Sequence, residues 1–218
     1  MAVDYEANGV QFRMREIPAG GGVASFLMAE TEVTQELYEA VMGSNPSQFT
    51  GDDQRPVEQV SWEDAIVFCN TLSGLLGLTP VYQGTDNDAT MDESGNGFRL
   101  PFESEWEWAA RGGQNFTYAG SENLDDVGWY DDNSGGTTHP VGQKKANGYG
   151  LFDLSGNIFE WCNDDYENPG HYRPGAGQRV RRGGGWDFSA RFCHVAFRFR
   201  SAPFSRSYIL GLRLSRSL

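Results

Sequence analysis

Cysteine and histidine are scarce in this 218-residue sequence, which has three of each. The cysteines, Cys69, Cys162 and Cys193, are an odd set without Cys-x-x-Cys spacing, so the sequence predicts neither a disulfide framework nor a zinc site. The histidines lie far apart along the chain, and a histidine-based metal site is not predicted. No run of about 18 apolar residues is present, so no transmembrane segment is expected.

Basic residues are also few, at 17 against 30 acidic residues, and the net charge of −13 argues against nucleic acid as a partner. The imbalance is uneven, because residues 173–218 carry ten arginines and one acidic residue, Asp187. This tail has no lysine and is interleaved with aromatic residues, unlike the basic arms that bind nucleic acid. We therefore expect its arginines to pair with the acidic body of the protein during folding.

Glycine and proline are abundant, with 28 and 9 residues, which predicts short elements joined by ordered loops. Thr34 and Ser61 have the character of helix N-caps, and Asp64 completes a capping-box pair with Ser61. The pattern predicts helices at 35–42, at 62–73 and from after Pro101 to 111, strands at 12–17, 157–161 and 210–214, and a surface hairpin or loop at 84–97. With no repeat or linker, residues 1–218 are expected to form a single domain.

Several short phrases, spread along nearly the whole chain, resemble one known family and follow its order. They are TEVT at 31–34, PVEQVSW at 56–62, FRLP at 98–101, ESEWEWAARGG at 103–113, GYGLFDLSGNIFEW at 148–161, RVRRGGGW at 179–186 and GLRL at 211–214. The family is that of the formylglycine-generating enzymes, or sulfatase-modifying factors. The resemblance implies an α+β fold, the C-type lectin fold of the formylglycine-generating-enzyme type, loop-rich with little regular secondary structure.

The resemblance does not extend to the family's catalytic residues. Its oxidases hold copper with two cysteines, which correspond here to Phe188 and Cys193. A lone thiolate cannot form a two-sulfur copper site, so no copper is expected and the chain is predicted not to be an enzyme. Iron-dependent relatives need a histidine cluster that this chain lacks. A cysteine oxidase acting through Cys193 and a structural scaffold of the cell envelope remain the alternatives.

Residues 186–213 are rich in phenylalanine and hold five of the 14 in the chain. Thirteen positions in this segment carry none of Lys, Glu, Gln, Met or Trp, the five residue types that an asparagine codon cannot yield when only its adenines change. Diversity-generating retroelements alter lectin-fold proteins in this way, and the segment resembles that of their variable proteins. The candidate positions are Asp187, Phe188, Ser189, Phe192, His194, Phe197, Phe199, Ser201, Phe204, Ser205, Ser207, Tyr208 and Ile209.

The residues between these positions would form a constant frame that preserves the fold. The frame consists of Trp186, Ala190, Ala196, Pro203, Gly211 and Leu212. Aromatic rings separated by serines resemble an antibody paratope, where rigid contact area is combined with adaptable hydrogen bonding. We expect most of the thirteen side chains to be exposed and to form a binding patch. The alternative is that the phenylalanines belong to the core.

The resemblance also implies calcium sites built from oxygen ligands. The first site would use the side chains of Asp153 and Glu160 with the carbonyl groups of Gly156 and Ile158. A weaker second site would use Asp126, Asn133 and the carbonyl groups of Val127 and Gly135. The alternative is that Asp153 and Glu160 only bond the arginine-rich tail.

The function hypothesis is a non-catalytic display protein that binds a protein or other macromolecule on a host cell, a phage or a neighbouring bacterium. It is expected to be a monomer that binds no nucleic acid. The expected location is the cell surface or the extracellular space, as a bacterial lipoprotein whose signal segment is absent from this chain.

Overall fold

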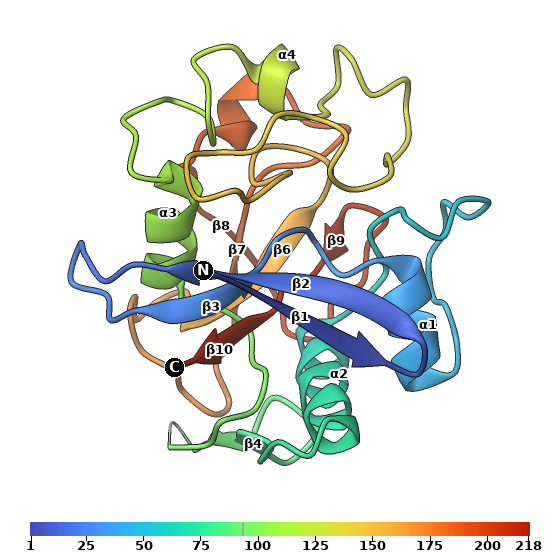
Figure 1. The fold of residues 1–218 in the computed structure, drawn as a ribbon, viewed down its shortest axis with the longest axis vertical. Helices are drawn as coiled ribbons and strands as arrows, with labels where there is room; N and C mark the ends of the chain where they lie inside the picture. Colours follow the sequence, from blue (N-terminus) through green and yellow to red (C-terminus); the bar gives the residue numbers. More distant parts are fainter. Residues whose placement is uncertain (93) are drawn as a thin grey trace.

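The computed structural model describes residues 1–92 and 94–218. One sheet has the strand order β1-β2-β3-β10 and is antiparallel throughout (Figure 1). Its strands are β1 (Ala2–Ala7), β2 (Val10–Ile17), β3 (Phe26–Ala29) and β10 (Ser215–Ser217). The predicted strand at 12–17 is confirmed as part of β2, whereas β1 was not predicted. The last residues of the chain thus pair with a strand near its start.

A second sheet has the order β8-β7-β6-β9 and includes two strands of the phenylalanine-rich segment, β8 from its middle and β9 from near its end. Its strands are β6 (Phe159–Asp165), β7 (Arg179–Arg182), β8 (Phe199–Ser201) and β9 (Leu210–Gly211). β6 is antiparallel to β7 and parallel to β9, and every residue of β6 and β7 is buried. The strand predicted at 157–161 begins two residues later, and the strand predicted at 210–214 ends at Gly211.

Three helices form where capping residues predict them. α1 (Gln35–Met42) begins after Thr34 and ends at Gly43, which is left-handed. α2 (Trp62–Leu75) has the predicted capping box between Ser61 and Asp64, but it continues past Gly74. α3 (Glu103–Arg111) ends at the left-handed Gly112. Local capping chemistry therefore fixes these ends, except where glycine is tolerated inside the last turn of α2.

The remaining elements are short and are joined by long loops. β4 (Tyr82–Gln83) pairs with β5 (Thr90–Met91), so the predicted hairpin or loop at 84–97 is, in its described part, the turn and second strand of a hairpin that begins two residues earlier. α4 (Leu124–Val127) and the 3₁₀ helix η1 (Ala190–Cys193) lie in the loop-rich half. This mixture of small sheets, few helices and ordered loops confirms the predicted α+β class. Within the described residues, no helix is long and apolar enough to cross a membrane.

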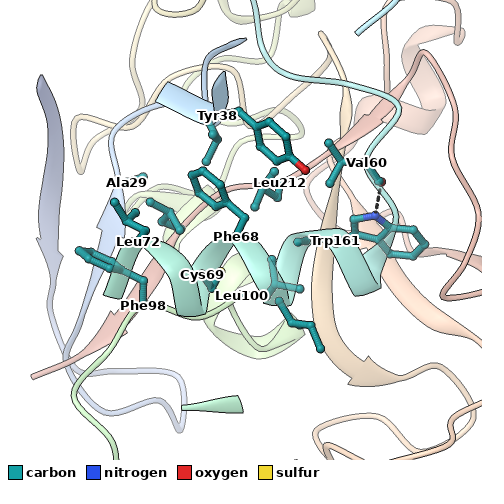
Figure 2. Packing of buried hydrophobic residues seen from close by; sticks show 14 of the residues in the cluster. Ala29, Tyr38, Val60, Phe68, Cys69, Leu72, Phe98, Leu100, Trp161 and Leu212 are labelled. Carbon is teal, nitrogen blue, oxygen red and sulfur yellow. Dashed lines mark hydrogen bonds between the residues drawn. The ribbon is translucent and has the colours of Figure 1, made fainter. Parts of the chain in front are cut away.

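The larger core cluster packs around α2 (Figure 2). The ring of Phe68 stacks on that of Tyr38 with 5.1 Å between centroids, which joins α2 to α1. Trp161 in β6 is fully buried, and its Nε1 donates to the carbonyl oxygen of Val60 at 2.9 Å (Figure 2). Cys69 lies on the buried face of α2 as a small apolar side chain.

Most arginines of the tail pair with acids of the body, as expected. Six of the ten form ion pairs, namely Arg173 with Asp165, Arg182 with Glu103 and Glu107, Arg198 with Glu103, Arg200 with Glu167, Arg206 with Asp64 and Arg213 with Glu160. The Arg213–Glu160 pair is fully buried. These pairs hold residues 173–213 against the acidic body.

Candidate ligand-binding surface

The segment 186–213 leaves β7 through the glycine run 183–185, forms η1 and β8, and returns as β9. Gly184 has φ +85°, and a Cβ there would lie 2.6 Å from Sγ of Cys193, so only glycine lets η1 pack this closely. The chain is therefore turned sharply before the first candidate position. Successive candidate side chains come from loops and short elements rather than from one strand face.

Most of the thirteen candidate side chains are half-buried rather than exposed, which corrects the expectation. Ser189, Phe204 and Tyr208 are exposed, whereas Ile209 is 7% exposed and belongs to the core. The half-buried positions are Asp187, Phe188, Phe192, His194, Phe197, Phe199, Ser201, Ser205 and Ser207. The expectation of free exposure was wrong because the aromatic rings pack against one another, so each ring covers part of its neighbour.

Four candidate phenylalanines and Phe159 of β6 form a closed set of ring contacts, which we call the phenylalanine circuit. The members are Phe159, Phe188, Phe192, Phe197 and Phe199. Consecutive centroid distances around the circuit are 5.2, 5.3, 4.9, 6.1 and 5.8 Å. Phe159 is fully buried and the other four are half-buried, so the circuit runs from the core to the surface. The five phenylalanines thus belong partly to the core and partly to the surface, so neither the binding-patch interpretation nor the core interpretation describes all of them.

A second aromatic group joins the start and the end of the segment. Trp186 packs on Tyr208 with centroids 5.6 Å apart, and Phe49 meets both rings edge-on. Nε1 of Trp186 donates to the carbonyl oxygen of Tyr208 at 3.2 Å. The backbone N–H of Phe49 donates to Glu58, and this fixes the loop that carries the ring. Sequence reasoning missed Phe49, since no local signal connects it with residues 137 or more positions away.

The backbone of the segment is anchored between the candidate positions. The carbonyl oxygens of Pro203 and Ser207 accept the N–H groups of Trp62 and Gln59. Gly211 leaves no room for a Cβ beside the carbonyl oxygen of Val57. Pro203, Gly211 and Leu212 are buried, as expected of a frame, whereas Trp186 and Ala190 are half-buried. Ala196 is exposed and does not serve the frame, because the neighbouring Val195 supplies the buried contact there.

Two arginines within the segment add side-chain anchors. Nε of Arg198 donates to both carboxylate oxygens of Glu103 of α3 at 2.8 Å. Arg206 forms a bidentate pair with Asp64 of α2 at 2.7 and 2.9 Å. Asp64 is partly buried, which raises its pKa, but the hydrogen bonds from Arg206 and Ser61 outweigh burial and leave its pKa below the usual value. Both arginines therefore tie the loops to helices that lie outside the segment.

Other aromatic and polar groups extend this surface. His194 meets the ring of Tyr118 edge-on at 5.1 Å, and the exposed Arg191 lies 4.4 Å above the ring of Phe192. Phe204 is 68% exposed on a turn of its own. The serines supply small hydroxyl groups beside these rings. A surface of this composition can bind a partner through contact area and hydrogen bonds.

The cysteines offer no accessible thiol. Cys69, Cys162 and Cys193 are all free and buried. Burial raises the pKa of Cys193 to about 12, and the pKa values of the other two are raised by the same cause. A thiol with such a pKa is almost entirely protonated at neutral pH, so it is a poor nucleophile and a poor metal ligand.

The arrangement of the first predicted calcium site does not fit a calcium ion. Both carboxylate oxygens of Glu160 accept hydrogen bonds from Arg213, and one also accepts from Nε1 of Trp106 at 2.6 Å. Asp153 accepts the N–H of Gly142 with one oxygen, and its other oxygen is buried without a partner. Burial raises the pKa of Asp153 to about 6. A buried guanidinium thus already neutralises Glu160, and calcium at Asp153, Gly156, Ile158 and Glu160 stays a prediction.

The residues of the weaker second site are likewise engaged with one another and with backbone. Asp126 accepts hydrogen bonds from Ser121 and Asn123, and the side-chain oxygen of Asn133 accepts the N–H of Tyr130. The described residues contain no group of three or more acidic, histidine or cysteine side chains that could hold a metal ion. Calcium at Asp126, Val127, Asn133 and Gly135 therefore stays a prediction.

Comparisons with known proteins agree on one family. A sequence model of the "Sulfatase-modifying factor enzyme 1-like domain" matches residues 9–218. The chain is 38% identical over 230 residues to "Chaperone protein LppX" of Paenibacillus barcinonensis, covering 89% of this chain and 81% of that protein. It is 32% identical over 195 residues to a formylglycine-generating enzyme of Streptomyces coelicolor, covering 77% of this chain but only 54% of the enzyme.

Solved structures give the same result for the fold. "Treponema denticola variable protein 1" superposes with a TM-score of 0.92 and 36% identity, covering 100% of this chain and 99% of that one. The "Major Tropism Determinant M1 Variant" superposes with a TM-score of 0.51 at 12% identity, covering 94% of this chain and 54% of that one. The second match supports the fold alone.

Proposed function

We propose that this chain, which belongs to the sulfatase-modifying factor enzyme 1-like family, is a non-catalytic display protein whose segment 186–213 is diversified to bind different ligands. Its similarity to a Treponema variable protein supports a ligand-binding scaffold of this kind. The observation that carries the proposal is the phenylalanine circuit, in which four half-buried candidate rings are linked to one another and Phe159 is the one fully buried member.

The way the segment is anchored supports tolerance to change at the candidate positions. The anchors are backbone contacts at Pro203, Ser207 and Gly211, and the side chains of Arg198 and Arg206. Backbone contacts do not depend on side-chain identity, and neither arginine is a candidate position. Ser207 uses only its carbonyl oxygen. Replacing the candidate side chains therefore leaves these anchors in place, with the exception of the buried Ile209.

The absence of an accessible thiol supports the non-catalytic part of the proposal. Formylglycine-generating enzymes are relatives of this chain, but the family resemblance places Phe188 at the position of their first copper cysteine, and the ring of Phe188 belongs to the circuit. Cys193 is buried beneath the glycine run with a raised pKa. An oxidase would need both thiols at a substrate-accessible site.

The partner we propose is a protein or other macromolecule, since the surface is broad, aromatic and spread over several loops. A display protein must face that partner, so we propose a location at the cell surface or outside the cell. We also propose that the chain acts as a monomer. The similar chaperone from Paenibacillus is compatible with a macromolecule-binding role but assigns no client to this chain.

A paired library tests the proposal. In the first library, the twelve candidate positions other than Ile209 are randomised with codons that replace the adenines of an asparagine codon. In the matched control library, twelve half-buried positions elsewhere in the chain are randomised in the same way. Both libraries are displayed on yeast and selected for binding to hen egg-white lysozyme, and unselected members are melted by circular dichroism.

The proposal predicts that most members of the first library melt cooperatively near the parent and that specific lysozyme binders emerge from it alone. It is contradicted if the first library is as poorly folded as the control, or if its binders retain affinity after the parental segment is restored. Surface labelling of intact cells and light scattering of the purified chain test the location and the monomer.

A further inference from the structure

Arg181 is the exception among the arginines of the tail. It is 7% exposed and lies in β7, and its side chain makes no hydrogen bond or ion pair within residues 1–92 and 94–218. Its Nε is buried without a partner, as are those of Arg179 and Arg182, but those two arginines use their other nitrogens to donate to oxygen acceptors. Six other tail arginines have carboxylate partners, Arg179 and Arg216 donate to oxygen acceptors, and Arg191 is exposed. A guanidinium buried without an acceptor is costly, so this arrangement calls for an explanation.

The guanidinium of Arg181 lies at the buried side of the phenylalanine circuit. Its Cζ is 4.3 Å from the ring centroid of Phe159 and 4.4 Å from that of Phe199. Phe199 faces it directly across the β7–β8 pair, which fixes this geometry through the backbone. The two rings compensate part of the lost hydration by cation–π contact, but they accept none of the N–H hydrogen bonds.

One acidic side chain, Asp187, is close enough to influence this charge without pairing with it. Asp187 forms no ion pair with Arg181, and its Oδ1 is also buried without a partner. Burial lowers the pKa of Arg181 to about 10, and the nearby Asp187 offsets this only in part. Burial likewise raises the pKa of Asp187. Both groups are thus desolvated with unused hydrogen-bonding capacity at the same surface.

We infer that Arg181 is a constant anion anchor beneath the variable surface, and that it binds a carboxylate of the ligand whose neighbouring apolar or aromatic group packs on the phenylalanine circuit. The inference rests on the proposed function. Arg181 precedes the segment 186–213, so every diversified form of the chain would keep it while the surrounding rings change. A planar carboxylate matches the fork of a guanidinium and fits between flat rings better than a tetrahedral phosphate.

Small aromatic anions serve as probes in a titration of the full chain followed by arginine Nε–Hε resonances in NMR. The probe is phenylacetate. Phenylacetamide is its neutral counterpart of nearly the same shape, and phenyl phosphate carries a tetrahedral anion. The Arg181 resonance is identified by its loss in Arg181→Lys. We expect phenylacetate to shift this resonance saturably, phenylacetamide to leave it unmoved, and phenyl phosphate to bind more weakly.

Substitutions distinguish binding of the probe at Arg181 from a general effect of surface charge on its affinity. Arg181→Met retains the length and packing of the side chain but should weaken phenylacetate binding by about tenfold or more, the loss of a charge-assisted interaction. Arg13→Met removes an exposed arginine of β2, outside the candidate surface, that pairs with Asp4, and it should change the affinity less than about twofold. Asp187→Asn should strengthen binding, since it removes a competing carboxylate. A thermal melt confirms that each variant is folded.

The inference is overturned if phenylacetamide binds as well as phenylacetate, or if folded Arg181→Met binds like the parent. Equal losses in Arg181→Met and Arg13→Met would also overturn it, since only general charge would then be involved. Failure of the display proposal is distinct, because it appears as unfolded library members whatever the probe does. A well-folded, ligand-selecting library together with no phenylacetate response would reject the anchor alone.

Discussion

Three phenylalanines that differ in burial test whether the segment is part of the core or a surface that covers it. Phe159 is fully buried in β6, Phe197 is half-buried in the circuit, and Phe204 is 68% exposed. Each is replaced by alanine, so the chemistry of the change is constant and only its surroundings differ. If the segment is a surface that covers a constant core, the loss of unfolding free energy must be largest at Phe159, smaller at Phe197 and smallest at Phe204.

The expected costs follow from burial and ring contacts. Phe159→Ala leaves an enclosed cavity between Phe188, Phe199 and Arg181, and should cost about 3–5 kcal/mol. Phe197→Ala loses two ring contacts at the surface and should cost about 1–2 kcal/mol. Phe204→Ala should change stability by less than about 0.5 kcal/mol.

Equilibrium unfolding in urea measures these free energies, with fluorescence and circular dichroism as two probes. The slopes must agree between variants so that the midpoints can be compared. The reasoning is refuted if Phe197→Ala or Phe204→Ala costs as much as Phe159→Ala. In that case the candidate rings are structural core, and diversification at those positions would destroy the fold.

Further predictions concern the charges, the thiols and calcium. Arg213→Met should lower the free energy of unfolding by about 3–5 kcal/mol, because it leaves Glu160 buried and unpaired; a loss below about 1 kcal/mol would contradict this. Burial raises the pKa of Asp153 to about 6, so as the pH falls the folded protein takes up this proton before the unfolded chain does. Between pH 7 and pH 5 this group should therefore increase the free energy of unfolding by on the order of 1 kcal/mol. Asp153→Asn should abolish that share of the increase in urea titrations at the two pH values, and an unchanged increase would count against it. The three buried thiols should react with Ellman's reagent only after unfolding, and rapid native labelling of Cys193 would reopen an oxidase role. Because Arg213 neutralises Glu160, a chelator or added calcium should leave the melting temperature unchanged, whereas a calcium-dependent increase would restore the predicted site.

Local chemistry made much of the fold predictable. Thr34, Ser61 and Asp64 marked helix starts through capping bonds that span three residues, and Gly112 marked an end through its left-handed conformation. β1 was missed although Val3, Tyr5 and Ala7 alternate with Asp4 and Glu6, so the strand pattern was present in the sequence. The pairing of the tail arginines followed from charge balance, although no sequence pattern could show which acid each one meets.

The sequence predicted which residue types form the candidate surface, but not how deeply each side chain is buried. The codon pattern selected thirteen positions without regard to burial, so it included Ile209, whose side chain enters the core because β9 pairs with β6. It could not include Phe49, Phe159 or Arg181, which contact the candidate side chains from other parts of the chain. Ala196 fitted the family's frame in sequence, yet its turn places it in solvent.

The central claim is that variation is confined to the candidate positions while the frame stays constant. Sequencing the gene and its sister copies, with the DNA that flanks them, tests this most directly. The account predicts copies that differ only at the candidate codons, beside a reverse-transcriptase gene and a near-repeat of the segment with adenines at those codons. Sister sequences that vary evenly along the chain, with no such repeat, would contradict it.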